Sequence, residues 1–134
     1  MKKFESACYC GKVRCSFTLP IKNVVQCHCS MCRALQGTDY STWVAVEAKQ
    51  FTIEAGEEYL THYQVNERSS KRFCSHCGTG VYGINGQHFS EYKMVPLGTV
   101  RHYSSELKPK IQAYTKDKAE WVQLHDEVPI LTAK

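Results

Sequence analysis

Eight cysteines in a chain of 134 residues constrain this sequence more than any other feature. They occupy positions 8, 10, 15, 27, 29, 32, 74 and 77, and most are separated from the next by only one or two residues. An even number of cysteines is compatible with a secreted disulfide framework. Such short spacings, however, are awkward for disulfides and typical of thiolates gathered around a metal ion at a turn.

The remaining sequence favours the metal interpretation. Lys2 and Lys3 resemble the start of a secretion signal, but residues 4–8 do not form an apolar run of the required length. No stretch approaches the roughly 18 apolar residues of a membrane helix. We therefore expect a cytoplasmic protein without a membrane partner, whose thiols stay reduced and free to bind metal.

The formal net charge is +4, which raises the question of a nucleic-acid partner. Seven bound thiolates and two zinc ions would lower it to about +1. The strongest basic candidates for a DNA-binding strip are Lys108, Lys110, Lys116 and Lys118. With so small a net charge and no basic tail, we do not expect nucleic acid as a partner.

The chain reads as a series of short strands. Residues 12–19 alternate between apolar and polar side chains, which indicates a half-buried strand ended by Pro20. Residues 4–9 and 12–18 then form the two arms of a hairpin with thiols at its tip. Cys15 lies on the apolar face of this strand, so we expect it to be a core residue.

Further strands are expected at 24–26, 40–46, 51–55, 59–65, 71–74, 81–83, 89–95 and 111–114. Asn85-Gly86 is a hairpin signal, and residues 31–36 can form a short helix with Ser30 as its N-cap and Gly37 at its end. Residues 116–122 are expected to be a helical or turn segment. The sequence thus predicts one mainly β domain over residues 1–134, built from short antiparallel sheets with little helix.

Two pairs of cysteines together provide enough ligands for one complete metal site. Cys8 with Cys10 and Cys74 with Cys77 supply four thiolates, the set that fills a tetrahedral structural zinc site. Such a site would join the first hairpin to a much later one. We expect these four residues to be structural ligands.

The other group, Cys27, Cys29 and Cys32, supplies only three thiolates, which leaves room for a substrate as in catalytic zinc sites. The alternative is that Cys15, His28 or another residue closes this site. His28 and His76 lie inside the cysteine loops and are expected to be exposed to solvent.

The chemistry expected of the three-cysteine group is thiol activation. Three thiolates weaken the Lewis acidity of zinc, so activation of water is a poorer fit than binding of an incoming thiol as thiolate. A bound thiolate remains able to add to a small electrophile such as an aldehyde.

Three motifs in this order resemble the glutathione-dependent formaldehyde-activating enzyme and centromere protein V family. They are Cys-x-Cys-Gly-x-Val-Arg at 8–14, Cys-His-Cys-Ser-x-Cys-Arg at 27–33 followed by Gly37, and Cys-x-x-Cys-Gly at 74–78. With a weaker C-terminal pattern at 118–121, the resemblance covers about residues 6–122. It implies a β-tent fold with zinc between sheets, and formation of S-hydroxymethylglutathione from glutathione and formaldehyde, a carbon–sulfur lyase reaction.

The resemblance also implies two zinc ions, a structural one at Cys8, Cys10, Cys74 and Cys77 and a catalytic one at Cys27, Cys29 and Cys32. The chain is shorter than the formaldehyde-activating enzymes themselves. Glutathione has two carboxylates, which would need cationic partners. The cations nearest in sequence to the metal loops are Arg33, Lys71 and Arg72. Proton carriers near the open site could be Asp39, Tyr40 or His62. The alternative function is a zinc-stabilised structural or binding module without catalysis.

Overall fold

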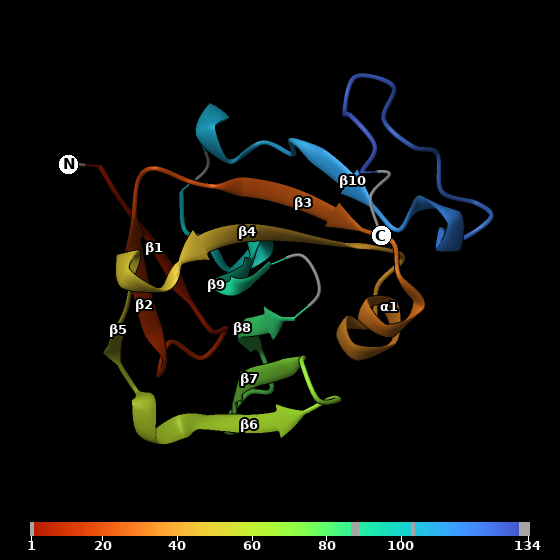
Figure 1. Ribbon diagram of the computed structural model, residues 1–134. Helices are drawn as coiled ribbons and strands as arrows, with labels where there is room; N and C mark the ends of the chain where they lie inside the picture. The colour runs from red at the N-terminus through yellow and green to blue at the C-terminus, as the bar shows by residue number, and fades with distance from the viewer. Residues whose placement is uncertain (1, 87–88, 103, 132–134) are drawn as a thin grey trace.

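The computed structural model describes residues 2–86, 89–102 and 104–131 (Figure 1). In chain order its strands are β1 (Lys3–Ala7), β2 (Arg14–Thr18), β3 (Asn23–Cys27), β4 (Ser41–Glu47), β5 (Phe51–Ala55), β6 (Leu60–Gln64), β7 (Ser70–Cys74), β8 (Gly80–Asn85), β9 (Phe89–Pro96) and β10 (Ile111–Ala113). Helix α1 spans Ser30–Gln36, and short 3-10 turns occur at Ala48–Gln50, Glu57–Tyr59, Leu97–Thr99, Ser105–Leu107 and Thr115–Asp117. The prediction of a mainly β fold with little helix is confirmed.

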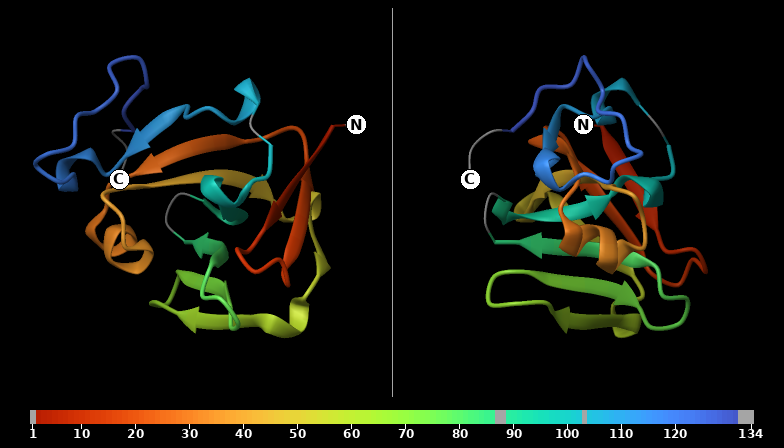
Figure 2. Two further views of the ribbon diagram at one scale, coloured as in Figure 1. Left: turned by 180° about the vertical axis from the view of Figure 1, so that it is seen from behind. Right: turned by 90° about the vertical axis from the view of Figure 1, so that its right-hand side faces the viewer.

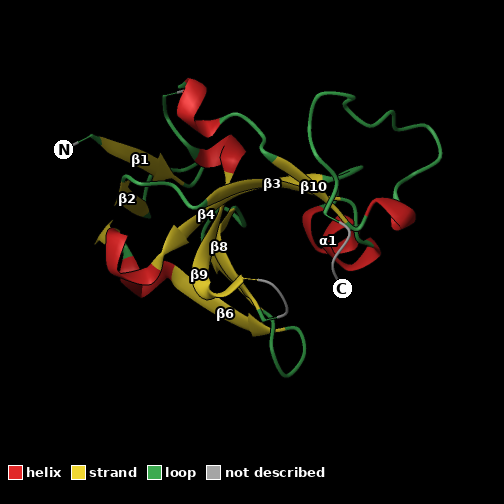
Figure 3. Cartoon of the chain, turned by 45° about the horizontal axis from the view of Figure 1, so that its top comes forward, coloured by secondary structure: helices red, strands yellow, loops and turns green. Residues whose placement is uncertain are grey.

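The strands form two sheets. The smaller has the order β1-β2-β5, and the larger has the order β10-β3-β4-β9-β8-β7-β6. The predicted first hairpin is confirmed, because β1 pairs antiparallel with β2. The pairing of β10 with β3 is parallel, so the large sheet is mixed. The smaller sheet and α1 lie at opposite ends of the molecule (Figures 1 and 3).

The main core is sandwiched between the two sheets. Phe4 and Phe17 of the small sheet stack at 5.5 Å between ring centroids and pack with Val44 and Val46 of β4. Cys15 belongs to this core and is 2% exposed, as its place on the apolar face predicts. Ser16, predicted to lie on the polar face, is buried as well, and its hydroxyl bonds the carboxylate of Glu54.

The other face of the large sheet carries a second apolar cluster. Successive side chains of a strand point to opposite faces, so Ala45 turns away from the main core while Val44 and Val46 enter it. Val25, Met94 and Ala113 join Ala45 in this cluster, and Trp43 packs against it. This cluster lies toward the end of the sheet where α1 begins, and it forms the floor of the site described below.

Helix α1 follows β3 almost directly and ends at Gly37, as predicted, with a left-handed backbone. Its N-cap is Cys29 rather than the predicted Ser30, because the Cys29 sulfur accepts a hydrogen bond from the backbone N–H of Cys32 at 3.3 Å. A thiol, rather than a hydroxyl, therefore stabilises the first turn of α1. Beyond β10, the chain loops around the α1 end of the molecule (Figure 2).

Candidate metal centres and substrate cavities

The four sulfurs of Cys8, Cys10, Cys74 and Cys77 lie within 4.8 Å of one another. Cys8 and Cys10 come from the loop between β1 and β2, whereas Cys74 and Cys77 come from the turn between β7 and β8. The sulfurs of Cys8 and Cys10 are 3.5 Å apart, and those of Cys10 and Cys74 are 3.8 Å apart. The cluster thus connects the small sheet to the large one.

The two cysteine turns of this cluster have the same local design. Gly11 follows Cys10 and Gly78 follows Cys77, and both have φ of +82°, a conformation that glycine adopts without steric cost. Each glycine N–H closes its turn by donating to the backbone carbonyl of the first cysteine, at 3.0 Å for Gly11 and 2.7 Å for Gly78. The cysteine–glycine motifs therefore place their thiols side by side through local backbone geometry.

Thr79 links the two turns. Its hydroxyl accepts a hydrogen bond from the backbone N–H of Tyr9 at 3.1 Å and lies 3.2 Å from the Cys77 sulfur. The contact with this hydroxyl is the main cause that lowers the pKa of Cys77 to about 5. Val13 likewise donates its N–H to the Cys8 sulfur at 3.3 Å. These contacts favour thiolates, which is the form that binds a metal ion.

The four-cysteine cluster fits zinc by both distance and donor type. With Zn–S bonds of about 2.3 Å, sulfurs at tetrahedral positions lie slightly less than ~4 Å apart, close to the separations found here. All four positions would be filled by protein. This arrangement is typical of a structural rather than a catalytic metal.

The second group of sulfurs, from Cys27, Cys29 and Cys32, also lies within 4.8 Å. Cys27 ends β3, Cys29 caps α1, and Cys32 lies in the first turn of that helix. The Cys27 and Cys32 sulfurs are 3.4 Å apart. All three thiols therefore come from one continuous segment of six residues.

Hydrogen bonds within this group favour the thiolate form of one cysteine and the thiol form of the other two. A hydrogen bond with Cys27 and another with Cys32 lower the pKa of Cys29 to about 2, while the bond with Cys29 raises the pKa of Cys27. The hydrogen bond with Cys27 lowers the pKa of Cys32, but the bond with Cys29 and burial outweigh it and raise this pKa to about 12. The Ser41 hydroxyl, which contacts Cys32, accepts a hydrogen bond from the Trp43 ring N–H at 2.6 Å. Without a metal, negative charge is therefore centred on Cys29.

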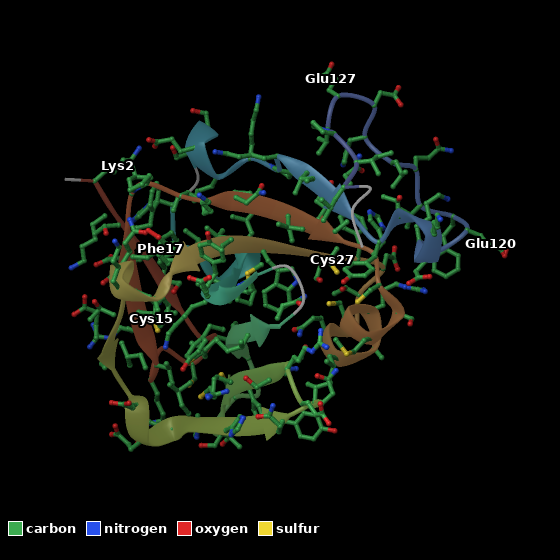
Figure 4. The ribbon with its side chains drawn as sticks, in the orientation of Figure 1. Lys2, Cys15, Phe17, Cys27, Glu120 and Glu127 are labelled. Carbon is green, nitrogen blue, oxygen red and sulfur yellow. The ribbon has the colours of Figure 1, made fainter. Side chains whose placement is uncertain are left out.

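Within the described residues, no fourth Cys, His, Asp or Glu joins the group of three. Cys15 lies in the main core, far from Cys27 (Figure 4). His28 does not belong to the group either. The structure therefore supports the open arrangement over closure by either of these residues.

The prediction that His28 is exposed is wrong. The imidazole is 1% exposed and stacks on Tyr40 with ring centroids 4.9 Å apart. Burial lowers the pKa of His28, and the nearby cations Lys118 and Arg33 lower it further. The ring is thus a neutral packing residue behind the cysteine loop. His76 is exposed, as predicted.

Two cavities meet at the group of three cysteines. The first has a volume of about 60 Å³ and is bounded by Cys27, Cys32 and mostly apolar side chains, including Leu35, Trp43 and Met94. The second is a groove of about 590 Å³ bounded by Cys29 and by polar residues of the loop between β6 and β7. The cluster thus faces a small apolar space on one side and a larger polar space on the other.

Tyr114 borders both cavities. Its backbone is left-handed with φ of 56°, which residues other than glycine rarely adopt and which is concentrated at functional sites. Burial, and then the charges of Cys27, Cys29 and Cys32, raise the pKa of its phenol. Nothing in the local sequence distinguishes Tyr114, because its position depends on the pairing of β10 with β3.

The cations that were nearest to the metal loops in sequence are engaged elsewhere. Arg33 donates to the backbone carbonyl of Asp117 at 2.9 Å, and Arg72 donates to the Ser70 hydroxyl at 2.8 Å. Lys71 borders the small cavity, but its ammonium donates to the Leu35 carbonyl at 2.8 Å.

The proton-carrier candidates Asp39, Tyr40 and His62 border neither cavity in the part of the chain that is described. Tyr40 instead stacks on His28, and His62 bonds the side chain of Gln64 at 2.8 Å. The groove also contains two charged residues that the sequence did not suggest, Glu67 and Arg68.

The fold and the two thiol clusters define a small mainly β protein with one closed and one open candidate metal centre. A family model described as glutathione-dependent formaldehyde-activating enzyme matches residues 3–117, and the chain belongs to this family.

Among solved structures, a crystal structure of a Rhodobacter sphaeroides protein from structural genomics is similar with a TM-score of 0.61 and 21% identity. The match covers 75% of this chain and 91% of that one, and at this identity it supports the fold alone. The comparison with curated proteins gave no match. Separately, none of the helices in the described part of the chain has the length and apolar character needed to cross a bilayer.

Proposed function

We propose that this chain is a zinc-dependent enzyme of the carbon–sulfur lyase type, which adds a thiol such as glutathione to formaldehyde or a related small aldehyde. The observation that carries this proposal is the position of the open three-cysteine group between a small apolar cavity and a larger polar groove. Membership of the glutathione-dependent family supports the same reaction class. A reducing compartment such as the cytoplasm would keep the thiols available.

Two zinc ions are proposed for each chain. Cys8, Cys10, Cys74 and Cys77 would hold the structural ion, and Cys27, Cys29 and Cys32 the second one. Zinc bound by the three thiolates would accept a substrate thiol in its anionic form and so make it nucleophilic at neutral pH.

The small cavity is suited to the aldehyde. Its volume of about 60 Å³ suffices for a small aldehyde such as formaldehyde. The apolar side chains offer few hydrogen bonds to competing water, and an aldehyde bound among them would have its carbonyl carbon beside Cys27 and Cys32. The walls of this cavity therefore supply both selection by size and positioning.

The groove is suited to the thiol. A thiol that enters beside Cys29 meets an aldehyde held in the adjoining cavity, with Tyr114 at the border between them. In the overall reaction a bond forms between the substrate sulfur and the carbonyl carbon, the C=O double bond becomes a single bond, and the thiol proton ends on the oxygen. No oxidant, reductant or leaving group is needed.

The test combines metal analysis with kinetics. Protein purified without chelator under reducing conditions should contain about two zinc ions, and it should accelerate exchange between glutathione and S-hydroxymethylglutathione measured by NMR. Cys32→Ser should retain one zinc ion and its fold but lose this acceleration. A fully folded Cys32→Ser protein with undiminished activity would refute the assignment, and a wild type with two tightly held ions and no activity would support the structural module instead.

A further inference from the structure

The groove beside Cys29 contains an arginine whose charge is not paired with any residue that the structure describes. Arg68 is exposed and borders the groove, and within the described residues the ion pairs are Lys2 with Glu106 and Lys3 with Glu54. No hydrogen bond of the Arg68 guanidinium is found in that part of the chain either. In contrast, the guanidinium groups of Arg33 and Arg72 are held by protein oxygens.

The loop that carries Arg68 is held in place by hydrogen bonds between its own residues. The Asn66 side-chain oxygen accepts hydrogen bonds from the backbone N–H groups of Arg68 and Ser69, both at 2.9 Å. The Val65 N–H closes the loop by donating to the Ser69 carbonyl at 2.9 Å. The loop is thus ordered before any ligand arrives, which reduces the entropy lost on binding.

Two neighbours fix the loop against the rest of the site. The Asn66 amide contacts the sulfur of Met31 in α1 at 3.9 Å, which brings the loop next to the helix that carries Cys32. On the other side Arg68 packs on Gly86 so closely that an added Cβ at Gly86 would lie 2.1 Å from the Arg68 Cβ. The backbone of Arg68 therefore has a defined position across the groove from Cys29.

The charges of the groove define the kind of ligand. Besides Arg68, the groove is bordered by Glu67, by the neutral polar residues Asn66, Ser69 and Asn85, and by Cys29, Met31 and Tyr114. A simple anion would meet the repulsion of Glu67. A ligand with a carboxylate and an ammonium group next to each other matches Arg68 and Glu67 together.

We propose that Arg68 binds the carboxylate of the thiol substrate, so that the enzyme selects amino-acid or peptide thiols over uncharged ones. This inference rests on the proposed function and adds to it the residue that determines the thiol class. Arg68 acts on binding, at a distance from the reacting sulfur, and so affects KM rather than kcat.

The experiment compares three thiols with formaldehyde as the common aldehyde. Glutathione carries carboxylates and an ammonium group, cysteamine only an ammonium group, and 2-mercaptoethanol neither. Arg68→Gln should raise KM for glutathione about tenfold, with KM for the other two thiols changed less than about twofold. Arg68→Lys should recover part of the loss, because it keeps the charge but not the bidentate geometry.

A second measurement does not depend on catalysis. S-methylglutathione, which has no free thiol, should bind the wild type in calorimetry about tenfold more tightly than it binds Arg68→Gln. Arg101→Gln is the matched control, because Arg101 is exposed but borders neither cavity. Both variants should have the far-UV circular dichroism spectrum and zinc content of the wild type.

The outcomes separate this inference from the proposed function. The inference is supported if the wild type accelerates the reaction and Arg68→Gln raises KM for glutathione much more than KM for 2-mercaptoethanol. If the wild type is active but Arg68→Gln changes all three thiols equally or not at all, the inference is overturned while the function stands. If no thiol reacts faster with the protein present, the proposed function fails. If Arg68→Gln binds S-methylglutathione as tightly as the wild type does, the inference is overturned whether or not the protein is active.

Discussion

Replacing Cys10 by serine should destabilise the whole protein, although the Cys10 side chain is exposed and its substitution leaves no cavity. The expected effect comes from the proposed structural metal alone. Three thiols hold zinc less tightly than four, so a chelator should remove this ion from Cys10→Ser while the wild type retains it. The small sheet then loses its cross-link to the large one.

The size of the effect follows from the length of chain that the cross-link closes. Cys10 and Cys74 are separated by 64 residues in sequence, and their sulfurs are 3.8 Å apart. Closing a loop of this length restricts the unfolded chain by about 4 kcal/mol in the chain-entropy model. Since domains of this size are stable by only about 5–15 kcal/mol, the loss is a large fraction of the total.

Urea unfolding in the presence of the chelator, followed by circular dichroism, measures this loss. With a slope of about 2 kcal/mol per molar urea, the midpoint should fall by about 2 M. The matched control is Cys29→Ser, because Cys27, Cys29 and Cys32 close only short loops and serine is a good N-cap for α1. Its midpoint should change by less than about 0.5 M.

Equal midpoints for Cys10→Ser and Cys29→Ser would refute this reasoning, since the four-cysteine cluster would then not cross-link the two sheets. A wild type whose midpoint is the same with and without its metal would refute it as well. Elemental analysis of the same samples shows which ion each variant has lost.

Three further predictions test other parts of the molecule. Leu35→Ala enlarges the small cavity, so the ratio of kcat/KM for butyraldehyde to that for formaldehyde should rise several-fold with a stability loss below about 2 kcal/mol; an unchanged ratio would mean that the aldehyde binds elsewhere. A hydrogen bond from Ser16 lowers the pKa of Glu54 below 4.5, so its stabilising contribution is complete above pH 4.5 and is lost as the pH falls through the lowered pKa. Glu54→Gln should therefore make the urea midpoint less dependent on pH between about 5 and 3, and an unchanged pH profile would contradict this. Gly56→Ala would place a Cβ 2.0 Å from a backbone oxygen in the β1–β2 loop at φ of +85°, so thermal unfolding should show a loss above about 2 kcal/mol, whereas Gly98→Ala, with no atom within 4 Å, should be nearly neutral. Equal melting temperatures for the two glycine variants would refute the steric argument.

Local features of this protein could be predicted from the sequence because they depend on neighbouring residues. The alternation in residues 12–19 predicted β2 and the burial of Cys15, and Gly37 predicted the end of α1. The cysteine spacings predicted two thiol groups, since one or two intervening residues at a turn already bring sulfurs close together. The predicted N-cap of α1, Ser30, is one residue from the observed N-cap, Cys29, because a thiol takes the place of the hydroxyl that usually caps a helix.

Features that depend on distant segments could not be predicted in this way. His28 was expected to be exposed, but it is buried where Tyr40 stacks on its ring and its backbone N–H donates to the carbonyl of Ala113 in β10. The parallel pairing of β10 with β3 brings Tyr114 to the cysteine group across more than 80 residues of sequence.

The same holds for the substrate site. Sequence proximity pointed to Arg33, Lys71 and Arg72, yet protein oxygens hold all three. The cation of the groove, which has no ion-pair partner among the described residues, comes from the loop between β6 and β7. Covalent spacing determines which thiols lie side by side within one turn, whereas the packing of the two sheets brings Cys8 and Cys10 together with Cys74 and Cys77. The same packing decides which side chains surround each group of thiols, because burial and cavity shape depend on every segment that meets there.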